Sequence, residues 1–393
     1  MLRSLQAQFL KEILKWSREQ KEKNLKRKLF TMAGLICVAW LISGISVALS
    51  WNHTARASNC FTTDYFRDNM FLTAAVIASA GSPNVTNTSV NGSGCNIGVY
   101  YPAGVTGTVG NVEIFGANYY GVVNNGGNVQ ITNSRIHDIG ENPLNGDQHG
   151  VGIYFVFGAP NKGKIAGNLI WNYQKGGIVV NGTAHKSTVS ITHNTVIGQG
   201  PVSYIAQNGI QVGYGALASV TNNMVSGNSY TGAGQTASGG IIVVGGSCYG
   251  GALTIGTKIT GNQVIGNDIG IWLSNLDGVT CIPTLTPTNI LTSNNISTND
   301  AINNTTGTGT DGYQAGVADQ GDGDKITNNS ICGLGYTPVN TPPPYLYFID
   351  VTATNNATVS GNTSCLDGSS VSAALSALKN IHVARHQRAA FVR

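Results

Sequence analysis

Charged residues are scarce in this chain: Asp, Glu, Lys and Arg make up only 10% of its 393 residues. They are also unevenly placed, because residues 1–28 carry nine basic and three acidic side chains, whereas residues 58–378 carry eight basic and fifteen acidic ones. The body of the chain is therefore mildly acidic and has no basic stripe to neutralise phosphates. We expect no nucleic-acid partner.

Close cysteine pairs are lacking too, which argues against a structural zinc site because such sites use closely spaced ligand pairs. One of the seven cysteines, Cys37, lies in an apolar segment. The other six are widely spaced, and their even number in an exported body indicates disulfides. In chain order they are Cys60, Cys95, Cys248, Cys281, Cys332 and Cys365.

One long uncharged run, residues 29–50, is long enough to span a bilayer. Basic residues 26–28 precede it, so segment 1–28 is predicted to be cytoplasmic and the body to be exported. Two interpretations of the run remain open. Its length favours a retained transmembrane helix, whereas the small residues around Ala57 favour a signal peptide that is cleaved there to release a secreted body.

Glycine is abundant, with 52 residues, and so are Asn, Thr, Ser, Val and Ile, a composition that favours strands and turns over helices. One phrase recurs: an aliphatic residue, a small polar residue, a variable residue, Asn, a variable residue and usually another aliphatic residue, as in "ITGNQV" at Ile259. A variant at Ile131 has Ser134 in the Asn place. The Asn positions of the other copies are Asn168, Asn194, Asn223, Asn262, Asn294, Asn329 and Asn362.

A second phrase, Gly-aliphatic-x-aliphatic, alternates with the first at a spacing of about 26–46 residues. Both phrases are short and alternate in polarity, so they are predicted to be strands, with no room for a crossover helix. A unit this small cannot bury its apolar residues alone, but stacked units can, and equivalent Asn side chains would then form a hydrogen-bonded ladder. The second phrase begins at Gly150, Gly177, Gly209, Gly240 and Gly270, with a weaker copy at Gly316.

The two phrases resemble those of the right-handed parallel β-helix superfamily, the pectate-lyase-like proteins, over about Asn111–Cys365. The resemblance implies an all-β solenoid in which the Asn turn joins the second and third sheets and the glycine phrase lies in the first. Residues 111–365 are then the parallel β-helix, residues 58–110 its N-terminal cap, and residues 366–393 a C-terminal cap and tail, with a short helix expected at 371–381.

The stacking also predicts which cysteines pair. Cys332 and Cys365 each follow a ladder Asn by three residues, so they would be neighbours on successive rungs, at a distance that suits a disulfide. Cys248 and Cys281 both follow a glycine-phrase strand and occupy the same corner. The remaining pair, Cys60 and Cys95, would staple the N-terminal end.

A resemblance to polysaccharide-processing β-helices would place catalytic groups on the first sheet and the loop before it. The stretch "GDQHGVGIYF" at Gly146 matches that place, with Asp147 and His149 as the leading catalytic candidates and Asp138 and Glu141 entering the same loop. Two carboxylates beside an imidazole can act as general acid and base on a glycosidic bond. The predicted substrate-binding residues are Arg135, Trp171, Tyr173 and Lys175, since sugars stack on aromatic rings and a lysine can hold a uronate.

An acidic stretch and one tryptophan are further candidates for ligand contacts. The acidic stretch "DQGDGDK" offers Asp319, Asp322 and Asp324 as oxygen ligands for Ca²⁺, although a solvated turn is the competing interpretation. Trp272 occupies the variable place of its glycine phrase, whose aliphatic neighbours point inward, so it is expected to face outward and be exposed.

Two functions are consistent with this sequence. The first is an extracytoplasmic protein that binds or processes a polysaccharide or cell-surface glycan, as a lyase, hydrolase or epimerase. The second is a non-catalytic surface β-helix used for binding or adhesion. The clustered acids, histidine and aromatic residues favour the first, and the lack of a recognisable catalytic set favours the second. No cofactor is expected apart from the Ca²⁺ considered above.

Overall fold

The computed structural model describes residues 59–182, 187–232, 236–304, 306–307, 310–339, 344–352, 356–364 and 374–375. The predicted cytoplasmic segment, the apolar run 29–50 and the cleavage site near Ala57 lie outside the described residues. Among the described residues, no helix combines the length and apolar character that a membrane crossing requires.

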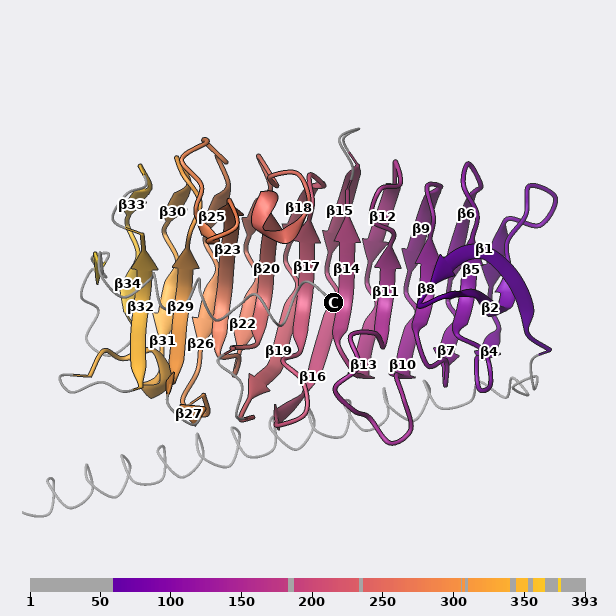
Figure 1. The fold of residues 1–393 in the computed structure, drawn as a ribbon, viewed down its shortest axis with the longest axis horizontal. Coiled ribbons are helices and arrows are strands. Elements are labelled where there is room, and N and C mark those ends of the chain that lie inside the picture. The colour runs from indigo at the N-terminus through magenta and orange to yellow at the C-terminus, as the bar shows by residue number, and fades with distance from the viewer. Residues whose placement is uncertain are drawn as a thin grey trace, which may run out of the picture. The chain divides into compact units, whose positions relative to one another are not determined.

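The described chain winds through three long sheets whose strands pair in parallel from one coil to the next (Figure 1). Sheet 1 is the largest, and the glycine phrases lie in it. Its strands, in order along the stack, are β1 (Phe61–Arg67), β2 (Met70–Ile77), β5 (Ile97–Tyr101), β8 (Tyr120–Asn124), β11 (Val151–Phe155), β14 (Gly176–Asn181), β17 (Asn208–Gly213), β20 (Gly239–Gly245), β23 (Ile269–Asp277), β29 (Tyr313–Asp319), β32 (Tyr345–Val351) and β35 (Ala374–Leu375), with β24 (Ile282–Pro283) beside β23.

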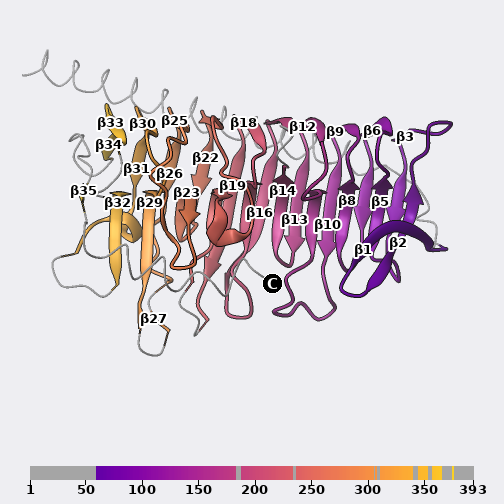
Figure 2. The ribbon, with the colours of Figure 1, turned by 45° about the horizontal axis from the view of Figure 1, so that its top comes forward.

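Sheets 2 and 3 flank the turn that carries the ladder position, as the resemblance implies, and Figure 2 shows several strands of sheet 2 in one row along the stack. Sheet 2 contains β3 (Asn84–Thr86), β6 (Thr106–Gly110), β9 (Asn128–Thr132), β12 (Lys162–Ala166), β15 (Thr188–Thr192), β18 (Leu217–Thr221), β21 (Lys258–Thr260), β25 (Leu291–Ser293), β30 (Lys325–Thr327) and β33 (Thr358–Ser360). Sheet 3 contains β4 (Ser89–Asn91), β7 (Glu113–Phe115), β10 (Arg135–Ile139), β13 (Leu169–Tyr173), β16 (Thr195–Val202), β19 (Met224–Tyr230), β22 (Gln263–Ile265), β26 (Ile296–Thr298), β31 (Ser330–Cys332) and β34 (Thr363–Ser364).

Small elements decorate the corners of the coils. They are the 3₁₀ turns η1 (Ser247–Tyr249) and η2 (Leu334–Tyr336) and the hairpin of β27 (Thr306–Gly307) and β28 (Thr310–Asp311).

The core is an axial column of aliphatic side chains contributed by all three sheets. In register, Ile165 of β12 pairs with Ile131 and Ile191 on the neighbouring coils, and all three are fully buried. The residue before each isoleucine in the strand faces the other way, and Lys164 and Gln130 are exposed. This is the period-two alternation of a strand with one buried face. Burying such a column is what makes stacked coils stable where one coil would not be.

Glycine recurs in sheet 1 because neighbouring backbones leave no room for a Cβ atom. A Cβ on Gly121 would lie 2.4 Å from the carbonyl oxygen of Gly152, and one on Gly152 would lie 2.7 Å from that of Gly177. The same contact repeats at Gly177 and Gly209. The register also corrects the start of one phrase: Ile153 pairs with Ile178, so the glycine equivalent to Gly177 is Gly152 and not the predicted Gly150.

The Asn ladder is confirmed and runs unbroken through eight coils. Each ladder residue donates its backbone N–H to the side-chain oxygen of the next one, at N···O distances of 2.9–3.0 Å. The Asn side chains also donate Nδ2–H to the next Oδ1, as Asn194 does to Asn223 at 3.0 Å. The ladder residues are Ser134, Asn168, Asn194, Asn223, Asn262, Asn295, Asn329 and Asn362.

One ladder position was predicted wrongly. The ladder residue is Asn295 and not Asn294, because Thr292, rather than Leu291, pairs with Ile259 and begins the phrase one residue later. The left-handed turn also belongs to the residue before the ladder position, where Asn294 has φ 55°. Asn and Gly tolerate this conformation, and Asn133, Gly167, Asn222, Gly261, Asn328 and Gly361 share it at equivalent places.

Regular coils begin earlier than residue 111. Within segment 58–110, Val99 already pairs with Val122 in sheet 1, and Val85 pairs with Val109 in sheet 2. The Asn pattern could not reveal these coils, because their ladder places hold Thr88 and Val112 instead of Asn. The antiparallel strand β1 covers the edge of β2 at this end.

At the opposite end, Ala374–Leu375 forms strand β35 beside β32, where a short helix was expected. An open sheet edge offers backbone partners, and these outweigh the helix propensity of the Ala and Leu residues in this segment. The rest of segment 366–393 lies outside the described residues.

Two of the three predicted disulfides are confirmed. Cys60 is bonded to Cys95 and Cys248 to Cys281, with Cα atoms 5.5 and 5.0 Å apart. Cys332 is also disulfide-bonded, and its predicted partner, Cys365, lies outside the described residues.

Candidate functional site

The loop that enters β11 from β10, residues 140–150, turns the corner from sheet 3 to sheet 1. The buried side chain of Gln174, one coil further on, holds it in place. Gln174 Nε2 donates to the Asp147 carbonyl oxygen at 2.8 Å and to Asn145 Oδ1 at 3.1 Å, while its Oε1 accepts from the backbone N–H groups of Glu141 and Asn145. The loop closes against Gln174 at Gly150, where φ is 80° and a Cβ would lie 2.4 Å from the Gln174 Cβ.

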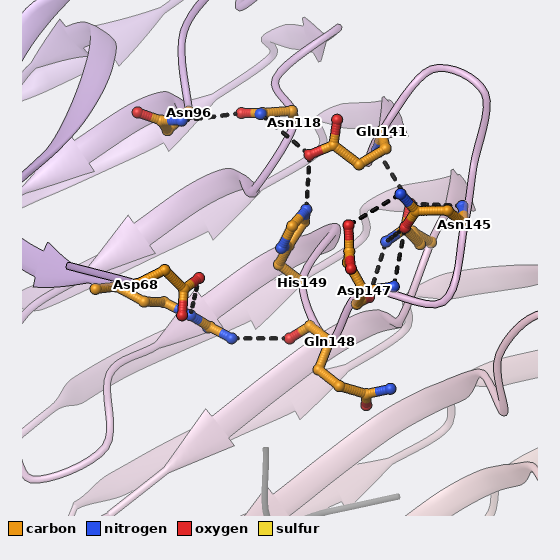
Figure 3. Close-up of polar contacts among 10 residues, drawn as sticks. Asp68, Asn96, Asn118, Glu141, Asn145, Asp147, Gln148 and His149 are labelled. Carbon is orange, nitrogen blue, oxygen red and sulfur yellow. Dashed lines mark hydrogen bonds and ion pairs between the residues drawn. The ribbon is translucent and has the colours of Figure 1, made fainter. Parts of the chain in front are cut away.

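This loop gathers three of the four predicted catalytic side chains (Figure 3). His149 Nε2 lies 2.8 Å from Glu141 Oε1, and one potential ligand atom from each of Glu141, Asp147 and His149 lies within 4.8 Å of the other two. His149 is 6% exposed, and its ring stacks on Tyr119 with centroids 3.9 Å apart. We call these three residues the corner cluster.

Asparagine side chains orient both carboxylates of the corner cluster. Asn118 Nδ2 donates to Glu141 Oε1 at 3.2 Å, and Asn96 in turn donates to Asn118 (Figure 3). Asn145 Nδ2 donates to Asp147 Oδ2 at 2.9 Å. Among the described residues, neither carboxylate forms an ion pair with Lys or Arg, so the positive partner of the cluster is at most the imidazole of His149.

Asp138, the fourth predicted catalytic residue, does not join the cluster. Its carboxylate lies 2.7 Å from His137 Nδ1 and also accepts a hydrogen bond from Asn172. Partial burial raises the pKa of Asp138, but the hydrogen bonds from Asn172 and His137 outweigh it and hold that pKa below its usual value.

Two predicted substrate-binding residues, Arg135 and Trp171, lie on the outer face of sheet 3. The Trp171 ring stacks on His137 with centroids 4.1 Å apart, and His137 stacks on Phe115 one coil earlier. The Arg135 guanidinium lies 5.6 Å from the centroid of the Trp171 ring. These side chains form a separate aromatic stripe rather than part of the corner cluster.

The prediction for Tyr173 is wrong, because its side chain is fully buried in the core. Its hydroxyl donates to Asn228 Oδ1 at 2.6 Å. The physical reason is Asn172, whose φ of 49° interrupts the alternation of β13 and turns the next side chain inward. Tyr173 cannot contact a substrate.

A groove of about 420 Å³ lies on the outer face of sheet 1, beside the corner cluster. It is lined by two cations, Arg67 and Lys175, and no carboxylate. Gln148, which lies between Asp147 and His149 in the chain, also lines the groove, and its carbonyl oxygen accepts a hydrogen bond from Arg67 at 2.8 Å. The aromatic lining residues are Tyr65, Tyr154, Phe157, Tyr214 and Tyr249.

Lys175, one of the predicted substrate-binding residues, lines this groove. Its Nζ donates to the carbonyl oxygen of Ala206 at 2.9 Å. Burial lowers the pKa of Lys175 to about 8, so the side chain is mostly protonated at neutral pH and loses its charge in mildly alkaline solution.

Sequence analysis missed Arg67, Tyr65 and Tyr154. Tyr154 had a usable signal: once the phrase starts at Gly152, Tyr154 holds the outward variable place. Arg67 and Tyr65 come from β1, an antiparallel strand outside the repeat, and no pattern linked them to residues about eighty positions away.

Two other candidates are internal. Trp272 points away from the axial column, as expected, but only 1% of it is exposed to solvent. Ile242 and Ala318 flank it on the neighbouring coils, and Gln320 accepts its Nε1–H. The Asp residues proposed for Ca²⁺ are also buried and do not converge as a three-ligand site; Asp322 accepts from Asn356, and Asp324 accepts from Thr288 and Ile290. Burial and the neighbouring Asp324 carboxylate raise the pKa of Asp319 well above its usual value.

This architecture agrees with a match to a known protein family. Residues 73–249 match the family described as "Right handed beta helix region". The chain has no match among the curated proteins or the solved structures that were compared. The three coiled sheets, the ladder and this match together show that the described part of the chain folds as a right-handed parallel β-helix.

Proposed function

We propose that the chain binds an extracellular polysaccharide in the groove on sheet 1. The observation that carries this proposal is the lining of the groove, which combines tyrosine rings with Arg67 and Lys175. Aromatic rings offer flat apolar surfaces with a polar edge, which suits the alternating faces of a sugar. The groove runs over β11, β14 and β17, and a long polymer fits a surface that repeats from coil to coil.

The charge of the groove favours an anionic glycan. Arg67 and Lys175 line it and no carboxylate does, although Arg67 is paired with Asp68 outside the lining at 3.3 Å. Arg67 brings one positive charge to the groove, although its guanidinium already contacts Asp68, Tyr120 and the Gln148 carbonyl oxygen, and Lys175 adds a second positive charge. Polymers of uronic acids carry such carboxylates on every ring.

The corner cluster supplies the chemistry for processing the bound chain. His149 and Glu141 form an imidazole–carboxylate pair, and Asp147 is an exposed carboxylate beside it. Such groups can remove and donate protons at a glycosidic bond or at the sugar carbon next to a carboxylate. The proposed reaction class is lyase, hydrolase or epimerase.

The proposal includes export of the body. Disulfides persist in oxidising compartments, and two are formed within the described residues. The apolar run 29–50 would hold the body outside the membrane, or cleavage near Ala57 would release it.

A panel of polysaccharides tests the proposal. The full chain is incubated with neutral and anionic polymers, and reducing ends and unsaturated products are measured. We expect product from an anionic polymer, a loss of product in Asp147→Ala and His149→Ala, and no loss in the matched control His137→Ala, whose ring lies on sheet 3. Product formation that survives both cluster substitutions would contradict the catalytic assignment.

A non-catalytic surface β-helix is the second candidate function. It is favoured by the bonds within the loop, since Asp147 is held by Asn145 and His149 by Glu141. The same panel separates the two, because a binding protein retains the anionic polymer but yields no product.

A further inference from the structure

We propose that the corner cluster is a metal site, in which Glu141, Asp147 and His149 hold one divalent transition-metal ion such as Zn²⁺. The donor set is one imidazole nitrogen and two carboxylate oxygens, a combination that suits zinc and its neighbours better than the all-oxygen sets of Ca²⁺ or Mg²⁺.

The geometry of the cluster comes close to that of a zinc site. Bonds of 2.0–2.2 Å place tetrahedral ligand atoms about 3.4 Å apart. The three donor atoms here lie within 4.8 Å of one another, and His149 Nε2 is already 2.8 Å from Glu141 Oε1. Closing three ligands around one ion requires rotation of the exposed Asp147 side chain and of Glu141, and leaves a fourth position open.

The imidazole of His149 is held in place by packing, which distinguishes the cluster from a chance group of surface acids. His149 is more than nine-tenths buried, and its ring is stacked on Tyr119 with its Nε2 directed at the cluster. Because a buried ring is already ordered, it loses little side-chain entropy when it binds a metal ion.

The charge of the cluster also favours a cation. Two carboxylates share this corner, and among the described residues no Lys or Arg forms an ion pair with either. Two nearby negative charges without a cation repel each other, and a divalent ion removes that repulsion.

Outer hydrogen bonds complete the resemblance to a metal centre. Metal-binding carboxylates are usually held by further polar groups that fix their orientation. Asn118 donates to Glu141, Asn145 donates to Asp147, and the buried Gln174 ties both ends of the loop together.

A second group in the same protein has the same residue types and lacks this convergence. His137 lies 2.7 Å from Asp138 through Nδ1 and 3.5 Å from Glu113 through Nε2. Because the two carboxylates meet opposite nitrogens of one ring, they cannot share an ion with the same ring nitrogen. This His137 group is a matched internal control.

Metal binding by the cluster is tested without any glycan, so its outcome does not depend on the proposed glycan activity. With an ion bound, the three side chains are ligands and do not act as the proton-transferring groups considered above. The full chain is stripped with a chelator, dialysed and titrated with Zn²⁺ by calorimetry, and bound metal is counted by elemental analysis. We expect one zinc site that is lost in His149→Ala and Asp147→Ala, weakened by more than about 100-fold in Glu141→Gln, and weakened by about 10-fold in Asn118→Ala, which removes only an orienting hydrogen bond.

The controls make the outcome decisive. His137→Ala must keep the zinc site with unchanged affinity, and circular dichroism must show that each variant is folded. Ca²⁺ is titrated in parallel and is expected to bind at least 10-fold more weakly. The proposal is overturned if the wild-type chain binds no stoichiometric Zn²⁺, or if His149→Ala and Asp147→Ala bind it as the wild type does.

Discussion

Single residues in left-handed conformation decide which side chains reach the surface of sheet 3. Asp138 and Asn172 occupy equivalent places in β10 and β13, with φ values of 53° and 49°. Each interrupts the strict alternation of its strand, so Ile139 and Tyr173 point into the core. The aromatic stripe of His137 and Trp171 remains outside, ahead of the interruption.

At the same scale, Asp268 links stability to pH. It is fully buried, and burial raises its pKa to about 7 despite hydrogen bonds from Ser229, Ser238 and Tyr230. The unfolded carboxyl, with a pKa near 3.8, loses its proton at lower pH than the native one. This residue therefore stabilises the fold most below pH 3.8, and that contribution is lost as pH rises through about 7.

Replacing Asp268 with Asn should remove this pH dependence. We expect the stability of Asp268→Asn, measured relative to the wild type by urea denaturation, to improve progressively between pH 4 and pH 7.5. The exposed Asp300→Asn serves as the control and should show a smaller change across the same range. A constant difference between Asp268→Asn and wild type at all pH values would rule out a protonated native Asp268.

The candidate site could be predicted only in part, and the reason is local. The position of Asp147 and His149 before the sheet 1 strand followed from the glycine phrase, and the structure confirms that they lie together with Glu141. Tyr173 could not be placed correctly, because the inversion at Asn172 leaves no mark in the polarity pattern. Arg67 could not be found, because its contact with Gln148 is made in space across coils.

At the scale of elements, the ladder is the strongest polar feature of the coils. Asn223 accepts from the backbone and the side chain of Asn194, and it donates to Asn262 and to the Ile191 carbonyl oxygen. All of these groups are buried away from water. Removing one ladder side chain therefore leaves buried donors and acceptors of the neighbouring coils without hydrogen-bond partners, which costs more than the loss of the bonds alone.

We accordingly expect Asn223→Ala to reduce the free energy of unfolding by about 3 kcal/mol, since it strands the buried N–H of Asn194. The neighbouring Asn222, which is exposed and has φ 55°, gives a matched control. Asn222→Gly keeps the left-handed turn and should change stability by less than about 0.5 kcal/mol. Equal losses in both variants, measured by thermal or urea unfolding, would contradict the role assigned to the ladder.

At the scale of the whole molecule, repetition made the architecture predictable. Both phrases recur, so an error in one copy, such as Asn294 for Asn295, leaves the others to establish the sheets. The ends were harder, because the first coils lack ladder Asn and the strand at Ala374–Leu375 is formed by edge pairing rather than by pattern. The repeated coils of a solenoid can thus be predicted from sequence, whereas its terminal coils are harder to predict.

The disulfides contribute to the stability of this stack. Cys248 and Cys281 close a loop of 33 residues, and restricting such a loop in the unfolded chain stabilises a fold by about 4 kcal/mol. Under oxidising conditions, we expect the double variant Cys248→Ser, Cys281→Ser to unfold at a lower temperature than the wild type. In reductant, which breaks the bond in the wild type as well, the variant and the wild type should unfold at the same temperature. Thiol labelling of Cys60, Cys95, Cys248 or Cys281 in protein recovered from outside the cell would show that these bonds do not form.

The most direct test of the functional account is a calorimetric titration of the full chain with an anionic oligosaccharide, such as an oligouronate. We predict that Lys175→Ala weakens binding by about 10-fold or more, because it removes a partly buried charge from the groove, whereas Lys164→Ala on the outer face of sheet 2 binds as the wild type does. Wild-type affinity should also fall as pH rises through about 8, where Lys175 loses its proton. Equal affinity of Lys175→Ala and wild type, or no binding of any anionic oligosaccharide, would contradict the account.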